Sequence, residues 1–198
     1  MGIGDENYKL LEFMFSNYDI KTVLDLGAQN FYHNHPPVKY GDYAHKYYAL
    51  KGVSHYENID INGDNNALVL DLTQPITMTR KYDLVTDLGT CEHISTTLDS
   101  EKLYNCWTSK YNASNRFIIS SNPSTGHWPK HGGYFFTTEF YVKLAELTGM
   151  KIIKLQYHYS MGNYESGREA ACILEKTKDS KWVTLSEFNS AFAFIKAS

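Results

Sequence analysis

Short runs of apolar residues alternate along the chain with longer segments in which apolar residues recur every three or four positions. Runs of this kind, bounded by turn residues, are typical of buried strands, and the longer spacing is typical of amphipathic helices. The pattern predicts strands at residues 21–26, 55–61, 67–72, 82–88, 116–121, 150–159 and 169–175. It predicts helices at residues 5–18, 42–51, 100–110, 139–148 and 185–195.

The order of these elements predicts an α/β fold of the doubly wound type, in which helices cover both faces of a mostly parallel sheet. The last two strands have similar lengths and are joined by a turn at 161–167, so we expect a C-terminal antiparallel hairpin. One domain accounts for all 198 residues. We divide it into an N-terminal helix (1–19), a core (20–177) and a C-terminal extension (178–198).

Four of the predicted strands carry an aspartate at or near the carboxyl end: Asp25, Asp60, Asp71 and Asp87. Ligands of open α/β sheets bind at these ends, and Gly27 would allow the first strand to turn tightly beside a ligand. A single aspartate at a strand end is more often a turn or helix-cap residue. The ordered set of four is what favours a nucleotide-like ligand.

Composition limits the classes of protein to consider. The chain is 42% apolar and 21% charged, which is typical of a globular protein, and its net charge of −3 does not favour nucleic acid as a partner. The cysteines are odd in number and widely spaced, so we expect no disulfide framework and a reducing compartment. The start of the chain has no signal-peptide pattern, and no apolar run is long enough for a membrane span, so we expect a cytoplasmic protein. The oligomeric state is left open.

Four motifs together resemble the class I S-adenosylmethionine (SAM)-dependent methyltransferases. They are Val-Leu-Asp-Leu-Gly at 23–27, Tyr-Glu-Asn-Ile-Asp-Ile-Asn at 56–62, Leu-Val-Leu-Asp-Leu at 68–72, and Tyr-Asp-Leu-Val-Thr-Asp-Leu-Gly-Thr-Cys-Glu-His-Ile at 82–94. The resemblance covers residues 20–177. It implies a Rossmann-like sheet of seven strands in the order 3-2-1-4-5-7-6, and SAM as the cofactor.

The resemblance also implies which residues hold this cofactor. Asp60 would accept hydrogen bonds from the ribose hydroxyls, and Asp71 would meet the adenine edge. The full implied set is Asp25, Gly27, Ala28, Gln29, Asp60, Ile61, Asp71, Leu72, Asp87 and Leu88. Gln29 stands where the family often has a second glycine, so its side chain would either contact the cofactor or narrow the site. Residues 30–40 lengthen the connection to the second strand, and they form either a lid over the cofactor or an ordinary surface insertion.

Candidate catalytic residues follow the fourth and fifth strands. Transfer to a hydroxyl needs positioning and a general base, for which we nominate His131 or His93, with Glu92 beside them. The alternative is that Glu92 and His93 cap a helix. The stretch 131–140 also resembles the small-RNA 3′-end 2′-O-methyltransferases, which pair it with a metal-binding Glu-x-x-Glu-His motif. Here Gly89 stands in place of the first glutamate, so a divalent metal is not favoured.

We therefore expect a SAM-dependent methyltransferase that acts on an oxygen of a small molecule or saccharide. Two alternatives stay open. The first is an RNA or nucleotide 2′-O-methyltransferase with a divalent metal, and the second is a non-catalytic Rossmann-like nucleotide-binding module. A dinucleotide-binding protein is disfavoured because the turn after Gly27 lacks the G-x-G-x-x-G spacing.

Overall fold

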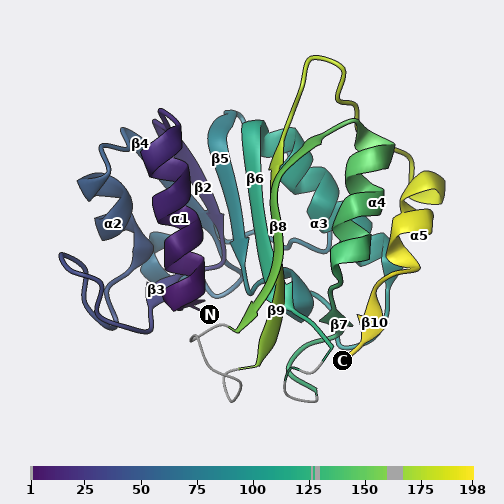
Figure 1. The fold of residues 1–198 in the computed structure, drawn as a ribbon, viewed down its shortest axis with the longest axis horizontal. Coiled ribbons are helices and arrows are strands. Elements are labelled where there is room, and N and C mark those ends of the chain that lie inside the picture. Colours follow the sequence, from purple (N-terminus) through teal and green to yellow (C-terminus); the bar gives the residue numbers. More distant parts are fainter. Residues whose placement is uncertain (1, 126, 128–129, 160–166) are drawn as a thin grey trace.

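A six-stranded sheet forms the centre of the computed structural model, which describes residues 2–125, 127, 130–159 and 167–198 (Figure 1). In spatial order, the strands are β4 (His55–Ile59), β2 (Thr22–Leu26), β5 (Tyr82–Leu88), β6 (Ser114–Pro123), β9 (Arg168–Glu175) and β8 (Lys151–Tyr159). The first four are parallel to one another, whereas β9 is antiparallel to both β6 and β8. The mostly parallel sheet and the antiparallel hairpin are confirmed, although most of the expected hairpin turn lies outside the described residues.

Helices cover both faces of this sheet because its strands are apolar on both sides. On one face, α1 (Asp5–Asn17) and α2 (Ala44–Leu50) pack in one core with Val23 and Leu84. On the other, α3 (Ser100–Ala113), α4 (Thr138–Thr148) and α5 (Leu185–Phe192) pack with Leu24 and Val85 (Figure 1). Successive strand residues thus point to opposite cores, as the doubly wound fold requires.

The expected seventh strand, at residues 67–72, is absent, so the prediction of seven strands is wrong. Only Leu68 pairs with Ile59 of β4, through two backbone hydrogen bonds that involve Asn58 and Asp60. The side chains of Leu68 and Val69 are 41% and 66% exposed. Longer pairing would therefore bury little additional apolar surface, and the chain leaves the sheet edge after one bridge. The remaining six strands keep the expected relative order.

Smaller elements lie outside the main sheet. Two 3₁₀ turns, η1 (Asp64–Asn66) and η2 (Cys91–His93), follow β4 and β5. A parallel pair joins β1 (Gly2–Ile3) to β3 (Asn30–Phe31), and an antiparallel pair joins β7 (Tyr134–Phe135) to β10 (Lys196–Ala197). The sequence pattern gave no sign of these two-residue strands, which are too short to show a period.

The segment 30–40 docks on α1. The Phe31 ring is completely buried in the core beneath α1, and the His33 and His35 imidazoles lie 3.1 and 3.2 Å from the Asp5 carboxylate. The His35 ring also stacks on Tyr8, with 4.0 Å between the ring centroids. These contacts hold the longer connection against α1. None of the residues expected in a lid lines the pocket described below.

Cys91 and Cys106 form a disulfide between η2 and α3, which the sequence analysis did not expect. The number and spacing of the cysteines did not predict this pair, because the fold, and not the distance along the chain, decides which two cysteines come into contact. Cys172 is a buried free thiol. Within the described part of the chain, no helix combines the length and apolar character needed to cross a membrane.

Candidate functional site

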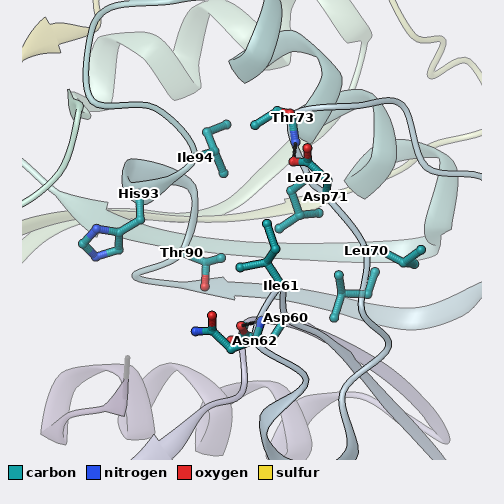
Figure 2. A pocket seen from close by; sticks show the side chains of 12 residues that line it. Asp60, Ile61, Asn62, Leu70, Asp71, Leu72, Thr73, Thr90, His93 and Ile94 are labelled. Atoms are coloured by element: carbon teal, nitrogen blue, oxygen red, sulfur yellow. Dashed lines mark hydrogen bonds between the residues drawn. The ribbon is translucent and has the colours of Figure 1, made fainter.

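A pocket of about 440 Å³ lies at the carboxyl ends of β2, β4 and β5 (Figure 2). Five of the predicted cofactor residues line it, namely Gly27, Asp60, Ile61, Asp71 and Leu72. The other lining residues are Ile59, Asn62, Leu70, Thr73, Thr90, His93 and Ile94. The pocket thus lies where ligands of doubly wound sheets bind.

The turn after β2 forms the floor of this pocket. Gly27 has a φ of 85°, which favours glycine, and its N–H donates to the carbonyl of Ile59 at 2.7 Å. The next amide, from Ala28, donates to Asp60 Oδ2 at 2.9 Å, and the amide of Asn62 donates to Asp60 Oδ1 at 2.9 Å. A carboxylate oxygen can accept more than one hydrogen bond. Both Asp60 oxygens can therefore still accept a ligand hydroxyl.

Asp71 and two apolar side chains form a second part of the pocket. The Asp71 carboxylate accepts a hydrogen bond from the amide of Thr73 at 2.9 Å, which fixes it in a turn. The side chains of Ile61 and Leu72 lie between Asp71 and Asp60 (Figure 2). Apolar surfaces with a few fixed polar groups are typical of sites for flat organic ligands.

Asp25 does not line the pocket. Its carboxylate is fully buried in the sheet and accepts hydrogen bonds from three hydroxyls, those of Tyr48 (2.9 Å), Tyr56 (3.0 Å) and Thr86. Burial raises the pKa of Asp25 to about 6, although the three hydroxyls counteract this effect. The structure therefore places Asp25 in a buried hydrogen-bond network beside the site.

Asp87 is also buried behind the pocket. Its Oδ2 pairs with the Lys110 ammonium at 2.5 Å and accepts hydrogen bonds from Ser120 and Asn122. Its Oδ1 accepts hydrogen bonds from the amides of Thr90 and Cys91 at 3.2 and 3.1 Å. Asp87 thus fixes the turn that carries Thr90 into the pocket wall.

Leu88 and Gln29, also predicted to bind the cofactor, do not line the pocket either. Leu88 is buried in the core under α1. The Gln29 side chain is completely buried, and its Nε2 donates to the Leu26 carbonyl at 3.1 Å and to Thr90 Oγ1 at 3.2 Å. Gln29 therefore ties the turn after β2 to the turn after β5.

The three predicted catalytic residues lie together beside the pocket. Glu92 Oε1 lies 3.4 Å from His93 Nε2 and 3.8 Å from His131 Nε2. One ligand atom from each residue lies within 4.8 Å of the others, a grouping that could hold a metal ion. Glu92 is 1% exposed, whereas the His93 and His131 side chains are 41% and 31% exposed. The imidazoles can therefore reach a ligand, and the carboxyl group supports them from behind.

Two glycines make this grouping possible. The amide of Gly133 donates to the Glu92 carbonyl at 2.6 Å. A Cβ at Gly132 would lie 2.5 Å from the same carbonyl oxygen, and a Cβ at Gly133 would lie 2.0 Å from the Ser95 carbonyl oxygen. Only glycines allow so close an approach, so the His-Gly-Gly sequence brings His131 to Glu92.

Burial controls the charges in this group. It raises the pKa of Glu92 well above its usual value, and the nearby Asp87 adds to the effect. Burial also lowers the pKa values of His93 and His131. At neutral pH, the arrangement therefore favours neutral imidazoles, which can accept a proton or bind a metal.

Two solved structures are similar to this chain. One is the magnesium protoporphyrin IX methyltransferase from Synechocystis PCC 6803 with bound SAM, with a TM-score of 0.53 and 12% identity over 86% of this chain and 76% of that one. This chain shares the fold of that enzyme. The other is the 1,6-didemethyltoxoflavin-N1-methyltransferase from Burkholderia thailandensis with bound substrate and S-adenosylhomocysteine, with a TM-score of 0.50 and 12% identity over 79% and 71%. No protein-family model matches the sequence, and no curated protein shows significant similarity to it.

Thr90 and Lys110 also support this site, and neither role was predicted from the sequence. Lys110 occurs at a helical spacing with Leu103 and Trp107, which are buried on one face of α3. A lysine on an otherwise apolar stripe signals a buried partner of opposite charge. That signal was present in the sequence. Thr90 gave none, because its role depends on the adjacent turn.

Proposed function

We propose that this protein is a SAM-dependent methyltransferase that acts on an oxygen of a small molecule or saccharide. The observation that carries the proposal is the pocket at the carboxyl ends of β2 and β4, with Asp60 and Asp71 at separate positions along it. The methyltransferase fold supports the class of reaction. The neighbour that binds didemethyltoxoflavin illustrates a small-molecule acceptor on this fold.

The residues present fit this cofactor. Asp60 would accept from the ribose hydroxyls, because both its oxygens keep a free acceptor position after binding backbone amides. Asp71 would meet the adenine edge, and Ile61 and Leu72 would pack against the ring. The bound cofactor supplies an electrophilic methyl group on sulfur.

His93 and His131 are placed to serve the acceptor. His93 lines the pocket and His131 lies beside it, with 5.1 Å between their ring centroids. A neutral imidazole near the acceptor hydroxyl would take its proton as the new bond to carbon forms. Glu92 would hold the two rings in place from its buried position.

The proposal is tested by calorimetric titration of the Asp60→Ala variant with S-adenosylhomocysteine. We expect affinity at least tenfold lower than that of the wild type, because hydrogen bonds to a charged acceptor are lost. The matched control is Asp64→Ala, which removes an exposed carboxylate four residues further on that does not line the pocket. Equal affinity in all three proteins would refute the ribose assignment.

A second candidate function is metal-dependent 2′-O-methylation of RNA or a nucleotide, which the grouping of Glu92, His93 and His131 favours. The donor set fits a divalent transition ion, since two imidazoles and one carboxylate suit Mn²⁺, Co²⁺ or Zn²⁺ better than Mg²⁺ or Ca²⁺. Glu92 Oε2 is buried without a hydrogen-bond partner, which leaves that oxygen for a cation. A metal held here would polarise the acceptor hydroxyl.

Titration with Co²⁺, followed by visible absorbance, distinguishes the two candidates. The metal-dependent candidate predicts one bound ion in the wild type and none in the Glu92→Gln variant. The His33→Ala variant is the control, because it removes an imidazole that does not belong to this group and that pairs with Asp5. No binding to the wild type, or equal binding to all three proteins, would contradict a metal at this site.

A further inference from the structure

A second cavity, of about 340 Å³, lies at the outer edge of β4, the strand that ends the sheet on this side. Among the described residues, none lines both this cavity and the pocket at Asp60 and Asp71. The expected seventh strand would have covered this edge, where only Leu68 bridges to Ile59. The lining comes from α2, β4 and the segment after β4, namely His45, Tyr56, Glu57, Asn58, Asn65, Asn66 and Leu68.

Two side chains of this lining have an amide NH₂ group that no described residue pairs with. Asn58 is 4% exposed, and its Nδ2 is buried without a hydrogen-bond partner. The Nδ2 atom of Asn65 is buried and unpaired in the same way. Buried polar groups in folded proteins are nearly always paired, because an unpaired one destabilises the fold. Since both residues line the cavity, a ligand there can accept the hydrogen bonds that the protein leaves unmade.

The second of these amides owes its position to an unusual turn. Asn65 and Asn66 have φ values of 54° and 56°, in the left-handed region that asparagine enters more readily than most residues. Gly63, with a φ of 71°, begins the same turn. The chain then returns to the sheet edge, where the Leu68 amide donates to the Asn58 carbonyl at 2.8 Å. The turn therefore places Asn65 in the same cavity as Asn58.

The carboxylate of Glu57 limits the charge of a ligand. It accepts a hydrogen bond from the Tyr82 hydroxyl and lies 3.4 Å from His55 Nε2. Its negative charge disfavours phosphate and carboxylate ligands, and the amide NH₂ groups, which can only donate, disfavour cations. The cavity therefore suits an uncharged ligand whose groups both donate and accept hydrogen bonds.

Two aromatic rings complete the lining. The Tyr56 hydroxyl donates to the buried Asp25 carboxylate at 3.0 Å, so the polar end of this side chain is occupied and its ring is left for the cavity. The His45 ring lies beside it, with 6.5 Å between the ring centroids. The apolar faces of such rings can pack against the C–H groups of a ligand.

We propose that this cavity binds a neutral saccharide unit, with Asn58 and Asn65 as its hydrogen-bond donors. Each sugar hydroxyl both donates and accepts, so one sugar ring can accept from the two amides and donate to Glu57. The volume of about 340 Å³ suffices for such a unit, since small-molecule pockets occupy about 300–1,000 Å³. The proposal does not rest on the proposed function, because the cavity and the cofactor pocket have different linings.

The test follows the side-chain NH₂ signals of ¹⁵N-labelled protein by NMR during separate titrations with glucose, galactose, mannose and N-acetylglucosamine. We expect at least one sugar to shift the Asn58 and Asn65 signals saturably, with a dissociation constant in the millimolar range. Asn58→Leu keeps the approximate shape of the side chain but removes the amide, and it should weaken binding of that sugar at least about threefold. Because an unpaired buried amide is removed, its urea midpoint should equal or exceed that of the wild type.

The matched control is Asn105→Leu, because the Asn105 amide has a partner, the Thr73 carbonyl at 2.9 Å. This control should lower the urea midpoint and leave sugar binding unchanged. A second variant, Asn65→Gly, removes the other amide and keeps the turn, since glycine suits a φ of 54°. It should also weaken sugar binding, and it decides the test if Asn58→Leu does not fold.

The proposal would be overturned if none of the four sugars gave a saturable shift, or if neither amide substitution weakened binding. Affinity for S-adenosylhomocysteine should be the same in the wild type, Asn58→Leu and Asn65→Gly, because neither residue lines the cofactor pocket. Failure of the saccharide site would therefore leave the proposed function as it stands.

Discussion

Substitution of Asp25 tests whether this buried carboxylate affects the stability of the fold and not the binding of a ligand. Its pKa is raised from 3.8 to about 6 in the folded protein because the carboxyl group is completely buried. We consider the substitution Asp25→Asn, which keeps the shape of the side chain and removes its charge. The amide can still accept from hydroxyls through its oxygen, whereas its NH₂ requires Tyr56 or another hydroxyl to act as acceptor.

The expected magnitude follows from the pKa difference. A shift from 3.8 to about 6 is roughly 2 pKa units, which corresponds to about 3 kcal/mol. Because the folded-state pKa is the higher one, the protonated carboxyl group stabilises the fold. This contribution is complete below pH 3.8 and is lost as the pH rises through about 6. The wild type therefore carries a buried charge at pH 7 that costs up to about 3 kcal/mol relative to the protonated state.

Urea unfolding at several pH values measures this effect, with tryptophan fluorescence as the signal. We expect Asp25→Asn to equal or exceed the wild type in free energy of unfolding at pH 7.5, and to lose that advantage at pH 4.5. Affinity for S-adenosylhomocysteine should change less than about twofold, because Asp25 does not line the pocket. A difference in the free energy of unfolding that does not vary with pH would refute the argument from burial. A large loss of affinity would show that Asp25 takes part in ligand binding.

Two further predictions concern the residues that hold the site in place. Gly133→Ala should lower any methyl-transfer rate by more than tenfold and the free energy of unfolding by about 1–3 kcal/mol, because the new Cβ would lie 2.0 Å from the Ser95 carbonyl oxygen. Normal kinetics and stability in this variant would show that the loop carrying His131 does not depend on that close approach. Lys110→Met should destabilise the protein by about 3–5 kcal/mol in urea unfolding, because it leaves the Asp87 carboxylate buried without its cation. The double variant with Asp87→Asn should regain part of that loss, and failure to do so would show that the lysine acts by packing alone.

Most strands and helices could be predicted from the sequence because they rest on long periodic segments, and the relative order of the strands followed from the resemblance to the methyltransferases. The four inner strands, β2, β5, β6 and β9, are paired on both sides and are largely buried. Residues 67–72 show why a local pattern is insufficient. Their apolar run is typical of a strand, but the side chains of Leu68 and Val69 are exposed, and pairing with β4 is limited to the bridge between Leu68 and Ile59.

Which of the acidic residues line the pocket, and which are buried behind it, could not be predicted from the sequence. Asp60 and Asp87 occupy similar positions at strand ends, yet Asp60 lines the pocket and Asp87 pairs with Lys110 behind it. What distinguishes them is the partner that the fold brings from a distant helix. The grouping of Glu92 with His131 could not be predicted either, because it depends on Gly132 and Gly133, which are distant from η2 in sequence but lie against Glu92 and Ser95.

Calorimetric titration of the wild-type protein with S-adenosylhomocysteine, with NAD as the control ligand, tests the central claim most directly. We predict that S-adenosylhomocysteine binds in the micromolar range at one site and that NAD shows no binding. Binding of NAD alone, or of neither ligand, would contradict the assignment of this pocket to a SAM-dependent methyltransferase.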